Sequence, residues 1–210
     1  MSRLQLWQQP YYPHRGWQLP LYQPHIQPPG YHPCYMRNIL QSITTLLDTV
    51  MTVQYRSYFT TLTINFPEWA PVDRSNNKFC STMEQFLRRI QIVHPQYIWV
   101  RERDQSIHQH YHLGLVIDDQ QTSSYIYLGQ ELQHLWNAQF SIYQENSGLV
   151  DYVRADQMKM SFLNSDIFNY AVYSHIVYRF SYIAKWYSKE SDLDPYTNRW
   201  MKSRLPMISC

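Results

Sequence analysis

The amino-acid sequence predicts an α+β fold in which helices pack on an antiparallel sheet. Three observations support this class. The 210 residues have a hydrophobic share of 44%, which is enough for one domain with a core. Segments with helical spacing of apolar residues lie between segments rich in β-branched and aromatic residues. Their order, α-β-α-β-β-α-β-α, is typical of helices that cover an antiparallel sheet.

The first part of this order contains two helices with one strand between them. Residues 39–50 carry apolar side chains at helical spacing, and SYFTTLTINF (57–66) has the composition of a strand. Ser81 followed by Glu84 is a capping-box pattern, so a second helix is predicted to begin there. Its buried side chains would be Met83, Phe86, Leu87 and Ile90.

The second part begins with a pair of strands. YIWVRE (97–102) and HYHLGLVI (110–117) predict two strands joined by a polar loop at residues 103–109. GQELQHLWNAQF (129–140) predicts a helix, and GLVDYV (148–153) predicts a short strand. A long final helix completes the predicted domain.

Residues 1–35 differ from the rest because proline recurs among Gln, Tyr and His. Repeated proline removes backbone donors and blocks helix formation, so the sequence predicts a disordered Pro/Gln/Tyr-rich leader. Such a leader either binds a partner or is dispensable. The predicted division is therefore a leader at 1–35, one folded domain at 36–192 and a C-terminal tail at 193–210.

Composition restricts the function classes. Eighteen basic and sixteen acidic residues give a net charge of +2, so any basic surface must come from local clustering. Nineteen tyrosines and seven tryptophans can fill a core or stack on single-stranded nucleic acid. Three widely spaced cysteines fit a reducing cytoplasm rather than a disulfide framework or a zinc site. No apolar run of 18 residues and no signal-peptide pattern occur, so we expect a cytoplasmic protein without membrane contact.

The sharpest local feature is His110-Tyr111-His112. Side chains alternate along a strand, so the two imidazoles lie on one face and can converge on one ion. If the loop spans residues 103–109, Glu102 lies opposite His110 and supplies a third ligand. His108 has the same strand parity and is the rival third ligand, ranked lower because hard cations prefer carboxylate. This donor set suits Mn²⁺ or Mg²⁺, and Gly114 would leave space beside the ion.

The final helix is predicted from Asp166 to Lys189, with Ser165 as its N-cap. One stripe is expected to bury against the sheet: Val172, Ile176, Phe180, Ile183 and Tyr187. The other combines basic and aromatic side chains: His175, Tyr178, Arg179, Tyr182, Lys185, Trp186 and Lys189. Such a stripe suits nucleic acid, and Arg179, Trp186 and Lys189 are the predicted DNA contacts.

Tyr182 is the candidate nucleophile on this helix. A phenol has a pKa of about 10, so it needs a cation that stabilises phenolate. Lys185, one turn away, could do this, hold a phosphate or protonate a leaving oxygen. Attack by Tyr182 would give a phosphotyrosyl link that conserves the phosphodiester energy for strand rejoining. Tyr178, one turn earlier, is either a second nucleophile or a surface packing residue.

Taken together, these motifs resemble the HUH endonuclease superfamily of rolling-circle replication initiators, conjugative relaxases and small transposases. WVRERDQSIHQHYHLGLVI followed by FSYIAKWYSK is more closely similar to inovirus-type replication proteins that share the YagK/YfjJ C-terminal domain. The resemblance covers about residues 38–190. It implies an HUH endonuclease domain of ferredoxin-like, Rep-type architecture at 36–192, and it has no counterpart for the leader.

The activity implied by the resemblance is metal-dependent nicking and joining of single-stranded DNA at an origin, which would start rolling-circle replication of a phage-like or integrated element. No G-x-x-x-x-G-K-[ST] pattern occurs, so neither a nucleotide cofactor nor a fused helicase is expected. Such a protein would need the helicase and polymerase of its bacterial host. Two alternatives remain: an inert DNA-binding or regulatory module of the same fold, and a single-strand transposase with the same chemistry.

Overall fold

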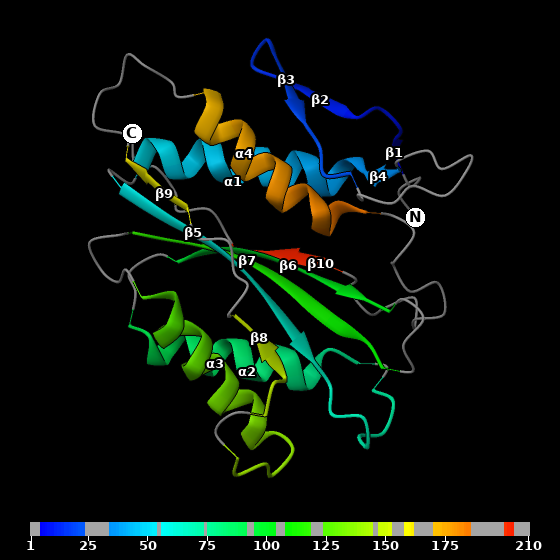
Figure 1. The fold of residues 1–210 in the computed structure, drawn as a ribbon, viewed down its shortest axis with the longest axis vertical. Helices are drawn as coiled ribbons and strands as arrows, with labels where there is room; N and C mark the ends of the chain where they lie inside the picture. Colours follow the sequence, from blue (N-terminus) through cyan, green and yellow to red (C-terminus); the bar gives the residue numbers. More distant parts are fainter. Residues whose placement is uncertain are drawn as a thin grey trace.

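A computed structural model of the chain shows an antiparallel sheet with helices on both faces (Figure 1). It describes residues 5–23, 34–53, 56–73, 75–91, 95–103, 108–118, 124–144, 147–152, 158–161, 170–185 and 200–203. The α-helices within these stretches are α1 (Arg37–Val53), α2 (Asn77–Arg89), α3 (Tyr125–Ala138) and α4 (Tyr170–Ser181), and a 3₁₀ helix, η1 (Tyr182–Ala184), follows α4. The predicted α+β class with an antiparallel sheet is confirmed. In the stretches described, every helix is too short or too polar to cross a membrane.

The main sheet is organised around the β6–β7 pair. Its strands are β5 (Arg56–Asn65), β6 (Gln96–Glu102), β7 (His110–Asp118), β8 (Val150–Asp151), β9 (Met158–Ser161) and β10 (Trp200–Lys202). The order is β10-β6-β7-β5-β8, β9 also pairs with β5, and these pairings are antiparallel. Glu102 lies opposite His110, as the predicted loop length required. Neither β9 nor β10 was predicted.

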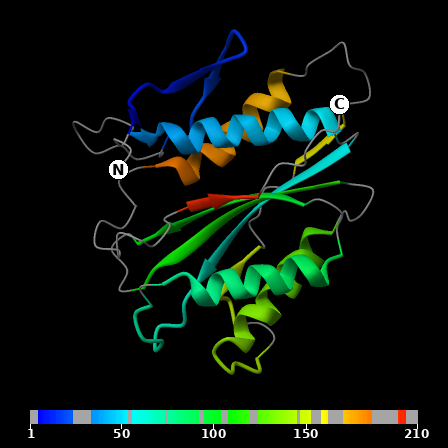
Figure 2. The same cartoon turned by 180° about the vertical axis from the view of Figure 1, so that it is seen from behind.

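Each face of the sheet has its own core, because side chains alternate along a strand. Helices α1 and α4 cover the face that carries Ile98 and Val116, whereas α2 and α3 cover the opposite face (Figures 1 and 2). Tyr111, Leu113 and Leu115 belong to the core on the α2/α3 side. Residues 110, 112 and 114 of β7 therefore face α1 and α4.

The N-terminal segment is ordered where the structure describes it, which differs from the disordered leader predicted at 1–35. It forms β1 (Leu6–Trp7), β2 (Tyr11–His14), β3 (Trp17–Pro20) and β4 (Tyr35–Met36), and the β2–β3 hairpin lies outside α1 and α4 (Figure 1). Leu19 and Leu21 are 0% and 1% exposed. Proline is tolerated here because each strand of a two-stranded hairpin has a free edge. The buried apolar side chains favour order where the proline content suggested disorder.

One carboxylate fastens this hairpin to both helices beneath it. Asp48 of α1 lies 2.9 Å from Nε2 of His14 and 3.2 Å from Nε of Arg15. The hydroxyl of Tyr173, on α4, donates to the same carboxylate at 3.0 Å. The hairpin, α1 and α4 are therefore joined at a single partly buried point.

The predicted start of one helix is wrong, and the predicted start of another lies outside the described residues. Helix α2 begins at Asn77, so Ser81 lies inside the helix and its interpretation as an N-cap is wrong. A local turn precedes the helix, in which the carboxylate of Asp73 accepts from the backbone N–H of Ser75 at 2.7 Å. Helix α4 is described from Tyr170 onward, and the predicted N-cap Ser165 lies outside the described residues.

Candidate functional site

The three predicted metal ligands meet at one end of the β6–β7 pair. One ligand atom from each of Glu102, His110 and His112 lies within 4.8 Å of the others. Nε2 of His112 is 3.3 Å from Oε2 of Glu102, and Nε2 of His110 is 3.8 Å from it. The rival ligand His108 lies apart from this group, with its Nε2 2.8 Å from the carbonyl oxygen of Glu68. The cross-strand pair thus supplies two donors, and alternation along β7 supplies the third.

This donor set could hold one metal ion. The Glu102 side chain is 1% exposed, and a buried carboxylate needs a cation or hydrogen-bond donors around it. Bonds of 2.0–2.2 Å place neighbouring ligand atoms roughly 3 Å apart in an octahedral site. The separations from Glu102 to the two imidazoles are only slightly longer than that, so a small contraction would let the group hold one ion.

A hydroxyl that sequence analysis missed orients one of these imidazoles. Thr63 lies opposite His112 in the β5–β7 ladder, and its Oγ1 is 3.1 Å from Nδ1 of that ring. Nε2 is then the atom that faces Glu102, and outer hydrogen bonds of this kind fix a metal-binding imidazole. Strand parity could have placed Thr63 on the correct face, but its partner depends on a register between distant strands.

Burial favours the neutral form of the His112 imidazole. It lowers the pKa of His112 below the ordinary value of 6.5, and the nearby His110 and Lys185 act in the same direction. The nearby Glu102 carboxylate acts in the opposite direction, but burial is the larger effect. A neutral imidazole has a free lone pair, so His112 can bind a cation near neutral pH without first losing a proton.

The predicted nucleophile lies directly beside this group. The ring centroid of Tyr182 is 5.0 Å from that of His112, with the two planes at 90°. Nζ of Lys185 lies 3.4 Å from the Tyr182 ring centroid and 3.8 Å from Oε2 of Glu102. Lys185 is 6% exposed, whereas Tyr182 is half-buried. One buried ammonium group therefore lies between the phenol ring and the carboxylate.

The backbone explains why Tyr182 and Lys185 meet. Helix α4 ends at Ser181, η1 follows, and residues three apart are eclipsed in a 3₁₀ helix. Lys185 has already left helical geometry, with ψ 133°, and its backbone forms an antiparallel bridge with Tyr35. The predicted continuous helix to Lys189 is therefore wrong at this point.

Gly114 has a different role from the one expected. Instead of leaving space for an ion, it accommodates Phe180 of α4: a Cβ at this position would lie 3.0 Å from Cε2 of that ring and 3.3 Å from Cγ2 of Ile98. The missing side chain lets α4 approach the sheet closely. Tyr182, two residues after Phe180, thereby reaches the ligand group.

The rest of the predicted helix stripes is described only in part. Ile176, Phe180 and Ile183 are buried as expected, and Val172 is half-buried. On the other stripe, Tyr178 and Arg179 are half-buried and His175 is exposed. Trp186, Tyr187 and Lys189 lie outside the described residues, so the predicted DNA contacts at Trp186 and Lys189 stay predictions.

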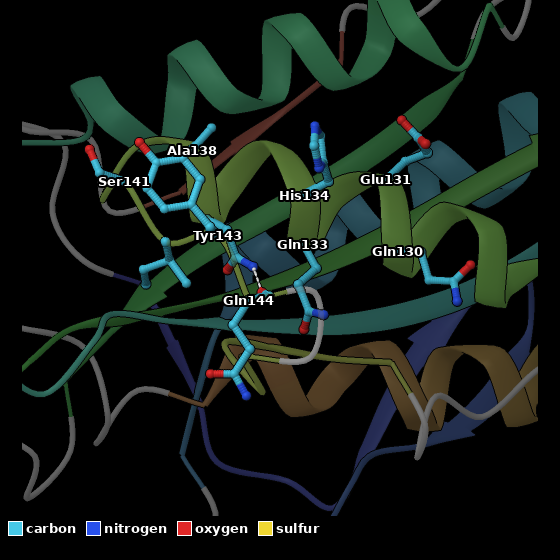
Figure 3. A pocket seen from close by; sticks show the side chains of 10 residues that line it. Gln130, Glu131, Gln133, His134, Ala138, Ser141, Tyr143 and Gln144 are labelled. Carbon is cyan, nitrogen blue, oxygen red and sulfur yellow. Dashed lines mark hydrogen bonds between the residues drawn. The ribbon is translucent and has the colours of Figure 1, made fainter.

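A separate hollow of about 570 Å³ lies against α3 and the loop that follows it (Figure 3). Its polar lining includes His134, Glu131 and Gln133, and the side chain of Asn137 donates to the carbonyl oxygen of Gln144 at 2.9 Å. Among the residues that the structure describes, the Glu102 group is the one set of three close metal-ligating side chains. The hollow therefore offers no comparable donor set.

Comparison with known proteins gives a match over most of the folded part of the chain. Residues 38–197 match the sequence profile of the YagK/YfjJ C-terminal domain. This stretch contains Glu102, the two histidines and Tyr182, but not the N-terminal strands β1 to β4. The chain matches no curated protein and no solved structure.

Proposed function

The chain belongs to the YagK/YfjJ C-terminal domain family, and we propose that it nicks and joins single-stranded DNA in a metal-dependent reaction. Tyr182 would be the nucleophile, and the domain would have an HUH-type architecture. The observation that supports it is the contact between the Tyr182 ring and His112, with Lys185 reaching both that ring and Glu102. Its setting would be an origin of rolling-circle replication in a phage-like or integrated element, served by the helicase and polymerase of a bacterial host in its cytoplasm.

The ligand group would hold the cofactor. When bound by Glu102, His110 and His112, Mn²⁺ or Mg²⁺ would act as a Lewis acid on a phosphate. Thr63 would keep the His112 ring in its binding orientation through Nδ1. The low exposure of Glu102 limits competition from water for its oxygens.

Tyr182 and Lys185 would carry out the transfer. The phenol oxygen loses its proton and forms a bond to phosphorus, while the bond from phosphorus to the leaving sugar oxygen breaks and that oxygen gains a proton. The phenolate is the nucleophile, and the ammonium group of Lys185 lies over its ring. In the phosphotyrosyl product, a phosphodiester bond to Tyr182 replaces the broken phosphodiester bond of the strand. The reverse reaction can therefore rejoin a strand.

The first test is formation of a covalent adduct. The purified chain is incubated with Mn²⁺ and labelled single-stranded DNA from its own genetic neighbourhood, and an SDS-stable protein–DNA band is sought. Tyr182→Phe removes the attacking oxygen but keeps the ring, so nicking and adduct should both be lost. Tyr143→Phe, at a 95% exposed position, is the matched control and should behave as the wild type. An undiminished adduct in Tyr182→Phe would assign the attack elsewhere, with Tyr178 tested next.

A second candidate function is an inert DNA-binding or regulatory module. The observation that favours it is the ammonium group of Lys185 at 3.8 Å from Glu102, since this cation can balance the buried carboxylate without a metal. Such a module should bind DNA in a salt-sensitive way. It should not cleave DNA, whichever divalent ion is present. A single-strand transposase would give the same adduct as an initiator, and the two differ in their DNA substrate.

A further inference from the structure

We propose that Tyr22 is a positioning residue for Tyr182, and that the N-terminal segment forms one wall of the nucleophile site. This inference rests on the proposed function, because the effect of the position of Tyr182 is measured in the transfer reaction. Tyr22 lies outside the stretch that matches the family profile. The contacts of the folded chain alone assign it this role.

The ring contacts are direct. The centroid of the Tyr22 ring lies 4.9 Å from that of Tyr182, with an interplanar angle of 83°. This edge-to-face geometry is favoured for aromatic pairs and defines a ring orientation. Tyr182 is therefore contacted by Tyr22, by the His112 ring and by the ammonium group of Lys185. With three contacts around one ring, few rotamers remain open to Tyr182.

The backbone of Tyr22 is tied to the same short turn. Its N–H donates to Oγ of Ser181 at 2.7 Å, and Ser181 directly precedes Tyr182. Its carbonyl oxygen accepts a hydrogen bond from the hydroxyl of Tyr35, whose backbone bridges to Lys185. Tyr22 is thus connected to the chain on both sides of η1, where the backbone leaves helical geometry.

The segment that carries Tyr22 is anchored by buried side chains and by contacts to Asp48. Leu19 and Leu21 are fully buried, and Asp48 connects the hairpin to α1 and α4. A side chain held from such an anchored segment can keep the position of a neighbour to a few tenths of an ångström, which transfer chemistry requires. The tethered carbonyl and N–H hold the backbone of Tyr22 in place.

Tyr22 acts through its ring, not as a second nucleophile. Burial raises the pKa of its phenol, and the neighbouring Tyr182 acts in the same direction, so its phenolate is disfavoured. The contact with Tyr182 is an aromatic one, and replacement by phenylalanine preserves it. This distinction gives the test a conservative variant that should rescue the function.

The test measures single-turnover adduct formation at saturating Mn²⁺ and DNA, together with the affinity for each. Tyr22→Ala removes the ring, and Tyr22→Leu keeps apolar volume in case the alanine variant folds poorly. Both should slow adduct formation about tenfold, since misplacement by about 1 Å can cost up to 100-fold in rate. Tyr22→Phe should stay within about twofold of the wild type, because the edge-to-face contact remains. Affinities for Mn²⁺ and DNA should not change.

The controls separate the positioning role of Tyr22 from a general effect of changes in the N-terminal hairpin. Tyr11→Ala alters a 51% exposed tyrosine of the same hairpin and should leave the rate unchanged. The inference is overturned if Tyr22→Ala and Tyr22→Leu react at the wild-type rate, if Tyr22→Phe is as slow as Tyr22→Ala, or if the whole loss is in DNA affinity. Equal slowing by Tyr11→Ala would also overturn it. If the wild-type chain itself forms no adduct, the proposed function fails, and this inference fails with it.

Discussion

Arg101 and Glu102 are neighbours on β6 and point to opposite faces of the sheet, and both are almost completely buried, at 0% and 1% exposure. The guanidinium group of Arg101 donates to the backbone carbonyl oxygens of Ser75 at 2.7 Å and Asp73 at 2.6 Å. Glu102 instead faces two imidazoles and an ammonium group. Burial of a charge is common to both positions, but the chemistry around it differs.

The comparison separates a structural charge from a candidate metal ligand. The partners of Arg101 given above are neutral carbonyl oxygens, which do not titrate near neutral pH. The two imidazoles beside Glu102 can instead bind a metal ion together with it. Buried charges alone would not identify a functional site in this chain. The composition of the surrounding groups makes Glu102, and not Arg101, the candidate metal ligand.

The largest expected effect comes from Glu102→Gln. The neutral amide is a weaker ligand for hard cations, so we expect Mn²⁺ affinity to fall by more than about 100-fold, beyond the 10–100-fold typical of outer-sphere changes. Titration calorimetry measures this loss, and circular dichroism checks that the fold is retained. Glu68→Gln changes an exposed carboxylate near the same end of the sheet and serves as the control. If Glu102→Gln binds Mn²⁺ as tightly as the wild type, the proposed metal site is wrong.

Arg101→Met should lower the stability of the fold and leave the affinity for Mn²⁺ unchanged. Without the guanidinium group, the half-buried Ser75 loses a charged donor to its carbonyl oxygen, and the carbonyl oxygen of Asp73 keeps the side-chain amide of Gln109 as a donor. A hydrogen bond to a charged group contributes about 1.5–3 kcal/mol, so the free energy of unfolding should fall by about 3 kcal/mol. Urea denaturation measures this loss, and Mn²⁺ affinity should be retained. A loss of Mn²⁺ affinity at unchanged stability would contradict the division between the two faces.

Thr63→Val tests the orientation of one ligand with almost no change in volume. Loss of the hydroxyl partner of Nδ1 should weaken Mn²⁺ binding about tenfold, the lower range for outer hydrogen bonds. Thr61→Val lies on the same strand opposite Gly114, and its Mn²⁺ affinity should match that of the wild type. If the two variants bind equally well, Thr63 does not orient His112.

The smallest expected effect concerns pH. The lowered pKa of His112 means that the unfolded chain binds more protons than the folded one below pH 6.5. The stability of the metal-free protein should therefore fall as pH decreases from 6.5 toward the pKa of the folded state. Denaturation curves between pH 5 and 7.5 measure this slope, and His112→Asn should flatten it. A slope unaffected by this substitution would show that His112 contributes nothing to it.

The fold was predictable where local pattern determines it. Alternation in β6 and β7, together with a loop of seven residues, correctly placed Glu102 opposite His110. The N-terminal hairpin was not predictable, because its order depends on Asp48 and Tyr173, which are distant in sequence. Proline content carries no information about such partners.

The candidate site, too, was predictable only where local pattern determines it. His110 and His112 share a face by strand parity alone, so their convergence with Glu102 could be predicted from the sequence. Tyr22 and Thr63 could not be found, since each reaches its partner across a packing contact or a ladder between separate segments. The change from α-helix to 3₁₀ helix at Tyr182 also has no clear signal in the sequence.

The fit between Gly114 and Phe180 has a consequence for natural variation. Because a single added carbon at position 114 would already lie 3.0 Å from the aromatic ring, the two positions share one fixed volume. In relatives of this chain we expect the pair to covary: a larger residue in the strand should accompany a smaller one in the helix. Substituting both together should then preserve the spacing of the two layers, while changing the strand residue alone should not.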